Sequence, residues 1–312
     1  MNAYTIFDDY PAEAAEILRN AGVSFTVHPR GMPRPDAAQM KEILEAYDCV
    51  IIGTTQKITE DMFEHIDSPR VIATASVGVD HIRVPEDKRH LVTVFNTPAA
   101  NTPSVAEYNV GAMLMARRRL AEGDRLYAQG RTNKQLVRKP QELRGTTVGF
   151  VGAGRITTQT MALLKPFGVS FLCHTDDAPQ RQHLVSEYGV RFVSLRELAE
   201  TADIISVNVP ALPSTAGLIN AEIIGAMKED CIFVSIARES VLDIPALLKK
   251  AENCPAFYVM LDLDVLPDCV GANNGRNIVI TPHIAGGTVE ARRRMFLETA
   301  GYVADYRMHH TA

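Results

Sequence analysis

The chain has 312 residues, which exceeds the usual size of one hydrophobic core and suits two domains. Its formal net charge of −5 gives no overall attraction to nucleic acid or to an anionic membrane. The five cysteines are scattered and form no C-x-x-C pair, which argues against a disulfide framework or a zinc site. With no signal-peptide pattern and no apolar run of membrane-spanning length, we expect a cytoplasmic protein without a bound metal.

Short β-branched runs alternate with amphipathic stretches through the first hundred residues. Helices are predicted between the strands, for example over 12–19 and 37–46. The strands are apolar throughout, as in sheets whose two faces are both covered, so parallel strands with helical crossovers are expected. The predicted strands are 4–7, 23–27, 50–52, 71–75 and 92–95.

A second series of the same kind begins near Thr147. A helix over 104–120 is predicted to connect the two series, with Ser104 as N-cap and Glu107 as its capping-box partner. A last helix is predicted over 289–309. The strands of the second series are 147–151, 170–173, 190–193, 204–209, 232–236, 258–261 and 278–281.

The segment TTVGFVGAGRITTQTMALLKPFG predicts a strand, a tight turn and a helix. Glycines at Gly152 and Gly154 let backbone N–H groups approach an anion at the helix N-terminus, where a pyrophosphate is expected. A simple βα turn is the alternative, because two glycines alone are weak evidence. Thr157 stands where the third glycine of G-x-G-x-x-G is usual, so it either moves the helix away from the sheet or hydrogen-bonds at the helix start.

The next strand ends at His174-Thr175-Asp176-Asp177, about where an acidic residue holds the ribose diol in NAD sites. A solvated turn is the alternative for the two aspartates.

Together, these motifs and six others resemble the D-2-hydroxyacid dehydrogenase family along nearly the whole chain. The resemblance implies two doubly wound α/β parallel-sheet domains with the active site in the cleft between them. It places a flavodoxin-like substrate domain at 1–98 plus 286–312 and a Rossmann-type NAD domain at 99–285. The motifs are SVGVDHI, VFNTPAANTPSVAEYNVGAML, VGAGRI, VNVPALPSTAGLIN, SIARESVLDIPAL, LDLDVLPD and TPHIAGGTVEA.

The resemblance implies an oxidoreductase that transfers a hydride between NAD(H) and a small 2-keto or D-2-hydroxy acid. Arg238 would bind the carboxylate and the carbonyl oxygen, because a guanidinium is a fork-shaped, permanently charged donor. His283 would be the acid/base, since imidazole titrates near neutral pH. Relatives pair this histidine with a glutamate that is absent here. Asp268 is the expected substitute, and Asp264 is the alternative.

The resemblance also implies the remaining contacts. The substrate carboxylate would be held by backbone N–H groups of Val77, Gly78 and Val79. Two residues are expected to line the adenine pocket, Val209 and Pro210. The alternative is that they only pack at the end of their strand. Asp262 matches the aspartate that contacts the nicotinamide amide in relatives. The cofactor contacts are expected from Gly152, Gly154, Arg155, Ile156, Thr175, Asp176, Val209, Pro210, Ala237, Asp262, Ser104 and Val105.

The sequence differs from its relatives at three places that bear on cofactor and substrate. Thr175 stands where NAD-using relatives place the ribose aspartate, so Asp176 would take that role, and NAD is expected rather than NADP because Arg181 lies several residues away. Glu239 replaces a glycine beside Arg238. In the turn 53–57 only Lys57 could meet a phosphate, so an unphosphorylated acid is expected.

The basic segment 117–144 is similar to a family arm that packs on a second subunit, which predicts a homodimer and not nucleic-acid binding. A dinucleotide-sensing, corepressor-like protein without turnover is the rival interpretation, because some relatives act in that way. Measuring NADH turnover distinguishes the two.

Overall fold

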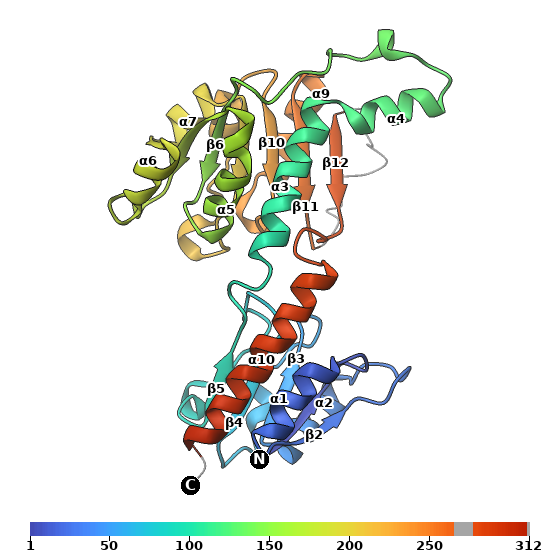
Figure 1. Cartoon of the computed structure of the whole chain (residues 1–312), viewed down its shortest axis with the longest axis vertical. Helices are drawn as coiled ribbons and strands as arrows, with labels where there is room; N and C mark the ends of the chain where they lie inside the picture. The colour runs from blue at the N-terminus through green and yellow to red at the C-terminus, as the bar shows by residue number, and fades with distance from the viewer. Residues whose placement is uncertain (265–276, 311–312) are drawn as a thin grey trace. The chain divides into compact units, whose positions relative to one another are not determined.

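The computed structural model describes residues 1–264 and 277–310, so Asp268 and Cys269 lie outside the described residues. The chain forms two compact units (Figure 1). The first contains Met1–Asn101 and Thr288–Ala312, and the second contains Thr102–Gly287. Both are α/β units built on parallel sheets, which confirms the predicted fold class.

The first unit has a five-stranded parallel sheet in the order β2-β1-β3-β4-β5. This is the flavodoxin-like order, in which the order of the parallel strands reverses between β1 and β3. Short strands of buried residues, such as Cys49–Ile52, form its centre because both faces are covered. Its elements are β1 (Asn2–Thr5), α1 (Ala12–Asn20), β2 (Ser24–Val27), α2 (Ala37–Ala46), β3 (Cys49–Ile52), η1 (Glu60–Phe63), β4 (Arg70–Thr74), η2 (Glu86–Lys88), β5 (Val92–Phe95) and α10 (Val289–His310).

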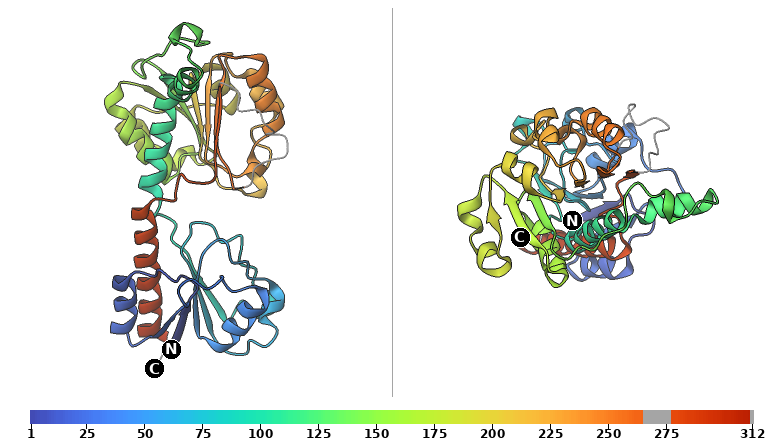
Figure 2. Two further views of the ribbon diagram at one scale, coloured as in Figure 1. Left: turned by 90° about the vertical axis from the view of Figure 1, so that its right-hand side faces the viewer. Right: turned by 90° about the horizontal axis from the view of Figure 1, so that it is seen from above.

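The last helix, α10, packs against α1, although the two are far apart in the sequence (Figure 2). Phe296 meets Phe7 at a centroid distance of 4.8 Å and Tyr10 at 5.0 Å. An ion pair between Arg293 and Glu13 of α1 closes the edge of this contact. Buried aromatic contacts of this kind attach the end of the chain to the first unit.

The second unit has a seven-stranded parallel sheet in the order β12-β11-β10-β9-β6-β7-β8. Its strand order reverses between β6 and β9, as in Rossmann-type folds, where ligands bind at the carboxyl ends of the strands. The strands are β6 (Thr147–Val151), β7 (Ser170–His174), β8 (Arg191–Phe192), β9 (Ile204–Val207), β10 (Ile232–Ser235), β11 (Tyr258–Asp262) and β12 (Ile278–Thr281).

Two hydrophobic clusters cover the two faces of this sheet. On one face, Met113 of α3 and Met161 of α5 pack on Phe150 and Val234. On the other, residues of α7, α8 and α9 pack on a second set of strand side chains, with Phe233 among them. The helices of the unit are α3 (Thr102–Arg117), α4 (Leu120–Ala128), η3 (Asn133–Gln135), α5 (Arg155–Leu164), η4 (Lys165–Phe167), η5 (Ala178–Arg181), α6 (His183–Tyr188), α7 (Leu195–Thr201), η6 (Pro213–Thr215), α8 (Ala221–Ala226), η7 (Glu239–Val241) and α9 (Ile244–Asn253).

The start of α3 corrects one prediction. The helix begins at Thr102, so Ser104 lies inside its first turn and is not the N-cap. Pro103 tolerates this position because the first helical N–H groups need no intrahelical partner. A break at Arg119, whose φ is +55°, separates α3 from α4. None of the described helices combines the length and apolar character that a membrane span requires.

Candidate active site

Three neighbouring strands of the second unit are each followed by a candidate residue, and each candidate lies the same number of residues beyond a set of paired strand residues. Ser235 of β10 pairs with Leu261 of β11, and Leu261 pairs with Ile280 of β12. Three residues further along each chain segment stand Arg238, Asp264 and His283. The register therefore brings a guanidinium, a carboxylate and an imidazole together at the carboxyl edge, where open α/β sheets bind ligands.

The three side chains are in direct contact. One carboxylate oxygen of Asp264 lies 2.7 Å from Nη1 of Arg238, and the other lies 2.5 Å from Nδ1 of His283. Arg238 Nη1 is 3.1 Å from His283 Nδ1. All three are partly exposed to solvent. This arrangement combines an anion-binding cation with a proton donor, which are the groups that reduction of a 2-keto acid requires.

A second aspartate, Asp262, holds the loop that carries His283. It ends β11, is only 4% exposed, and accepts hydrogen bonds from the N–H groups of Ile284 (2.9 Å) and Ala285 (2.8 Å). It also accepts from Oγ1 of Thr281 at 2.5 Å. His283 has a φ of +50°, a conformation that non-glycine residues seldom adopt. Asp262 therefore fixes a strained backbone at the candidate acid/base, while its predicted contact with the nicotinamide stays a prediction.

Tyr108 of α3 extends the same network. Its hydroxyl lies 2.7 Å from Oγ1 of Thr281. The Thr281 hydroxyl donates to the carboxylate of Asp262, so the Tyr108 hydroxyl is the donor to Thr281. Burial raises the pKa of Tyr108, which keeps it a neutral donor at physiological pH.

The turn Gly152-Ala153-Gly154 has the geometry of a phosphate-binding turn. Gly152 has a φ of +97°, and a Cβ there would lie 2.9 Å from Val209 Cγ1 and 3.2 Å from the Asn208 carbonyl oxygen. Gly154 is the N-cap of α5, without a side-chain cap and with no atom within 4 Å of the place a Cβ would occupy. The first turn of α5, to which Arg155 and Ile156 belong, thus has no side-chain cap and leaves room beside Gly154, while the binding of a pyrophosphate there stays a prediction.

The threonine that replaces the third glycine hydrogen-bonds at the start of the helix, the second of the two expected outcomes. Thr157 is completely buried, and its hydroxyl donates to the Gly152 carbonyl oxygen at 2.7 Å. It accepts from Nδ2 of Asn208 at 3.1 Å, and Asn109 donates to Oδ1 of Asn208 at 3.2 Å. Thr157, which departs from the glycine motif, therefore connects the turn to the end of β9 and, through Asn208, to α3.

The acidic residues after β7 differ from each other in their contacts. Asp177 accepts from Oγ1 of Thr175 at 2.5 Å and forms an ion pair with Arg181 at 2.8 Å. The hydrogen bond from Thr175, together with that from Arg181, lowers the pKa of Asp177. Asp176 is exposed. Arg181 is thus brought back to this strand end, although several residues separate it from Thr175 in the sequence.

The other predicted cofactor residues lie in the same unit. Ala237 is buried directly before Arg238, and its N–H donates to Oγ of Ser235 at 3.2 Å. Val209 and Pro210 follow β9, where Val209 contacts the place a Gly152 Cβ would occupy. Two residues of α3 are buried in its first turn, Ser104 and Val105. The structure gives the positions of these residues, and their roles stay predictions.

In the first unit, the loop after β4 presents unpaired N–H groups. Val77, Gly78 and Val79 donate none of their backbone N–H groups to any part of the chain that is described. A hydrogen bond holds the loop in place, because Nδ2 of Asn96 donates to the Val77 carbonyl oxygen at 2.6 Å. These free donors suit the predicted contact with a carboxylate.

A chain of hydroxyl groups shapes the same loop. Oγ of Ser76 donates to the Gly78 carbonyl oxygen at 2.7 Å and lies 2.8 Å from Oγ1 of Thr74. Nε2 of His81 lies 3.1 Å from Oγ1 of Thr74. Since each hydroxyl has one proton, the donors run from His81 to Thr74 to Ser76 to Gly78. Burial lowers the pKa of His81, which favours the neutral ring in this chain.

A cation from another loop, Arg34, contacts the turn 53–57, which the sequence did not reveal. Arg34, from the loop before α2, donates from Nη1 to Oγ1 of Thr55 at 2.5 Å and lies 5.8 Å from the centre of the Phe7 ring. The expectation that only Lys57 could meet a phosphate at this turn is therefore wrong. Arg34 was missed because it reaches the turn from another loop, a contact that spacing along the chain does not indicate.

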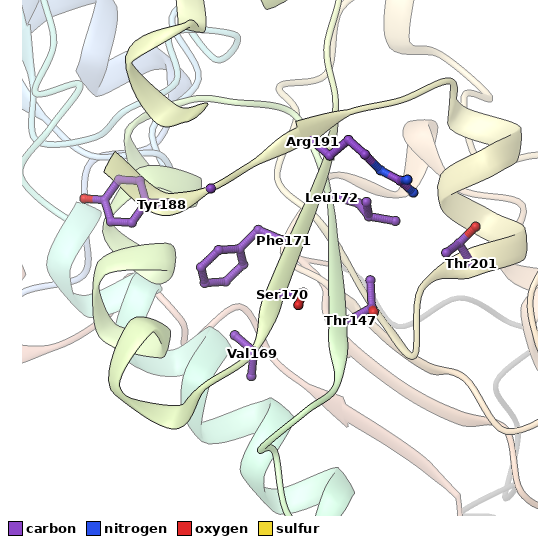
Figure 3. A pocket seen from close by; sticks show the side chains of 9 residues that line it. Thr147, Val169, Ser170, Phe171, Leu172, Tyr188, Arg191 and Thr201 are labelled. Atoms are coloured by element: carbon purple, nitrogen blue, oxygen red, sulfur yellow. The ribbon is translucent and has the colours of Figure 1, made fainter. Parts of the chain in front are cut away.

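A pocket at the other edge of the second sheet does not contain the candidate site (Figure 3). Thr147, Ser170 and Arg191, the first residues of β6, β7 and β8, line it. None of the predicted site residues contributes to the lining. This pocket therefore lies at the amino ends of the strands, opposite to the turn Gly152-Ala153-Gly154.

Comparisons with known proteins show which family the chain resembles. A family model described as "D-isomer specific 2-hydroxyacid dehydrogenase, NAD binding domain" matches residues 110–285. The glyoxylate reductase of Thermofilum pendens is 33% identical over 84% of this chain and 78% of its own length. The hydroxypyruvate reductase of Thermotoga maritima is 31% identical over 83% of this chain and 85% of its own.

A solved structure shows the same fold. The D-lactate dehydrogenase of Aquifex aeolicus, complexed with NAD and lactic acid, superimposes with a TM-score of 0.79 at 25% identity. The match covers 98% of this chain and 95% of that chain.

Proposed function

We propose a specific reaction for a chain that belongs to the D-isomer-specific 2-hydroxyacid dehydrogenase family: reversible hydride transfer between NAD(H) and a small, unphosphorylated 2-keto or 2-hydroxy acid. The chain is an NAD-dependent oxidoreductase of that family. The observation that carries the specific proposal is the contact of Arg238 with His283 beside Asp264 at the carboxyl edge of the sheet.

In the proposed reaction, bound NADH supplies the hydride. Arg238 binds the substrate carboxylate and polarises the neighbouring carbonyl group, because its guanidinium remains charged and offers several N–H donors. His283 holds the proton and donates it to the carbonyl oxygen as that oxygen becomes a hydroxyl group. In oxidation, the same imidazole accepts the proton. Asp262 keeps the His283 loop in place and does not itself transfer a proton.

We propose NAD rather than NADP as the preferred form. The ionised carboxylate of Asp177, with its lowered pKa, stands where the ribose is expected and disfavours a 2′-phosphate there. Arg181 is engaged by Asp177 at 2.8 Å and offers only part of its guanidinium to a phosphate. Asp176 and Thr175 remain the proposed ribose contacts.

We also propose that the substrate carries no phosphate group. Arg34 is hydrogen-bonded to Thr55 and packed on Phe7, so it has a structural role without any ligand. Rates with glyoxylate, hydroxypyruvate and pyruvate, compared with 3-phosphohydroxypyruvate, test this point. A clear preference for the phosphorylated acid would contradict it.

We also propose a homodimer formed through α4 and the segment after it, which extend away from the sheet of the second unit (Figure 1). Leu120 is 59% exposed and Tyr127 84% exposed, so α4 presents two large side chains to solvent that a second subunit could cover. At its base, α4 is anchored by Arg119, which donates to the Ala256 carbonyl oxygen at 3.1 Å. Light scattering of the wild type and of Tyr127→Lys tests the proposal, and a monomeric wild type would refute it. The cytoplasmic location stays a prediction.

The decisive experiment is NADH oxidation measured over a panel of 2-keto acids and repeated with NADPH. His283→Ala should lower kcat by roughly 100-fold or more while leaving NADH affinity unchanged. Arg238→Ala should raise the KM for the acid and also preserve NADH binding. A wild type that binds NADH but oxidises it with none of the acids would refute the proposal and favour the sensor interpretation.

A further inference from the structure

We infer that Asp264 has two roles: it is the carboxylate partner of His283, and it competes with the substrate carboxylate for Arg238. The inference rests on the proposed function, because it concerns the same site. Asp264 is the alternative to Asp268 as the substitute for the glutamate of relatives.

The contact with His283 supports the first role. Oδ1 of Asp264 lies 2.5 Å from Nδ1 of His283, so the ring donates its Nδ1 proton to the carboxylate. This hydrogen bond selects the tautomer and leaves Nε2 as the nitrogen that exchanges a proton with the substrate. A carboxylate in this position also stabilises the imidazolium ion while His283 carries the proton. Asp264 is therefore a positioning residue for the acid/base.

The contact with Arg238 supports the second role. Oδ2 of Asp264 lies 2.7 Å from Nη1 of Arg238, the distance of a charge-assisted hydrogen bond. No other ion pair of Arg238 occurs among residues 1–264 and 277–310. The guanidinium on which the proposed function depends is thus neutralised by the chain itself. A substrate carboxylate arriving at Arg238 meets the negative charge of Asp264 and must weaken this pair.

The partial exposure of Asp264 suits a carboxylate that can be displaced. Within the described residues its carboxylate contacts only Arg238 and His283, and it is 45% exposed. Asp262, two residues earlier, differs in each respect, since it is buried and accepts from two backbone N–H groups. Among residues 1–264 and 277–310, Asp264 can leave Arg238 without breaking a backbone contact and can keep its bond to His283. The substrate then takes the position vacated at the guanidinium.

The test separates anion affinity from turnover. Oxamate keeps the carboxylate and adjacent carbonyl of a 2-keto acid, and its Kd for the NADH-loaded chain is measured by calorimetry. Asp264→Asn should bind oxamate about fivefold more tightly, because a partly exposed ion pair no longer opposes it. The same variant should lower kcat with glyoxylate by about tenfold or more, because His283 loses its charged partner. A residue with only a structural role would not change these two quantities in opposite directions.

Two variants serve as controls. Asp264→Glu retains the negative charge, so its oxamate affinity should stay within about twofold of the wild type and part of the kcat should return. Glu229→Gln removes an equal charge from an exposed residue that precedes β10, at the other end of that strand, and should change neither quantity. NADH affinity and thermal denaturation of each variant verify that the chain is folded.

The outcomes distinguish this inference from the proposed function. Unchanged or weaker oxamate binding by Asp264→Asn, or an unchanged kcat, overturns the inference even if the wild type is an active reductase. If the wild type reduces no 2-keto acid, the proposed function fails. Tighter oxamate binding by Asp264→Asn would still support the competition at Arg238 in that case.

Discussion

Removing the carboxylate of Asp262 should loosen the His283 loop and lower both stability and turnover. Asp262→Ala deletes the acceptor of three hydrogen bonds, two of them from the backbone N–H groups of Ile284 and Ala285. Ile284 is half exposed, so water can satisfy its N–H, but Ala285 is buried. An unsatisfied buried N–H costs about 1–3 kcal/mol, and loss of the charged bonds adds to it. We expect the free energy of unfolding to fall by about 2–4 kcal/mol.

The effect on turnover follows from the backbone of His283. Its φ of +50° belongs to a conformation that costs on the order of 1–3 kcal/mol and persists only while the surroundings enforce it. Without Asp262 the loop relaxes, His283 leaves its position, and kcat falls. Asp262→Asn keeps the size and one acceptor, so both losses should be smaller, with about 1–2 kcal/mol of stability lost.

The assays are guanidinium denaturation followed by circular dichroism, and steady-state NADH oxidation with glyoxylate. The reasoning is wrong if Asp262→Ala unfolds at the wild-type denaturant concentration and retains the wild-type kcat. The Kd for NADH in the same variants tests the separate prediction that Asp262 contacts the nicotinamide. An unchanged Kd would leave Asp262 with the loop as its only demonstrated role.

Three further predictions follow from positions described above. Gly154→Ala should leave thermal stability unchanged but weaken NADH binding at least tenfold. Gly152→Ala, at φ +97°, should weaken NADH binding and also lose about 1–3 kcal/mol of stability. Equal effects of the two variants on stability would contradict the assigned geometry. Burial lowers the pKa of His81 below its ordinary 6.5, so its contribution to stability is complete above that pH and is lost as the pH falls further. His81→Gln should therefore lose less stability than the wild type in denaturation between pH 7 and pH 5, and parallel pH profiles would exclude this origin. Arg34→Ala should leave glyoxylate kinetics unchanged, and a large rise in the KM for glyoxylate would place Arg34 in the substrate site.

The fold class and the strand, turn and helix around Gly152 could be predicted because their signals are local. Apolar strands separated by helical stretches imply parallel sheets, and Gly152 and Gly154 follow a strand directly. The helix start at Thr102 was missed because a proline is acceptable in a first turn, so the competing N-cap signal at Ser104 misled the prediction.

Predicting the partner of His283 required information that a single sequence does not contain. Asp264 could have been favoured only by knowing that Leu261 pairs with Ile280, since residues 264 and 283 then extend equally far beyond the sheet. Strand register depends on packing across the whole sheet and is not written in local spacing. Arg34 illustrates the same limit, because its contact with Thr55 joins two loops of one unit.

The buried hydroxyl of Thr157 has a thermodynamic consequence for cofactor binding. By tying the Gly152 carbonyl to Asn208, it immobilises the turn before any dinucleotide arrives. If the dinucleotide binds at this turn as proposed, we expect its association to lose little backbone entropy there, which raises affinity without additional contacts to the phosphates. Thr157→Gly would restore the common glycine pattern yet release the turn, and calorimetry should record a larger entropic penalty for NADH.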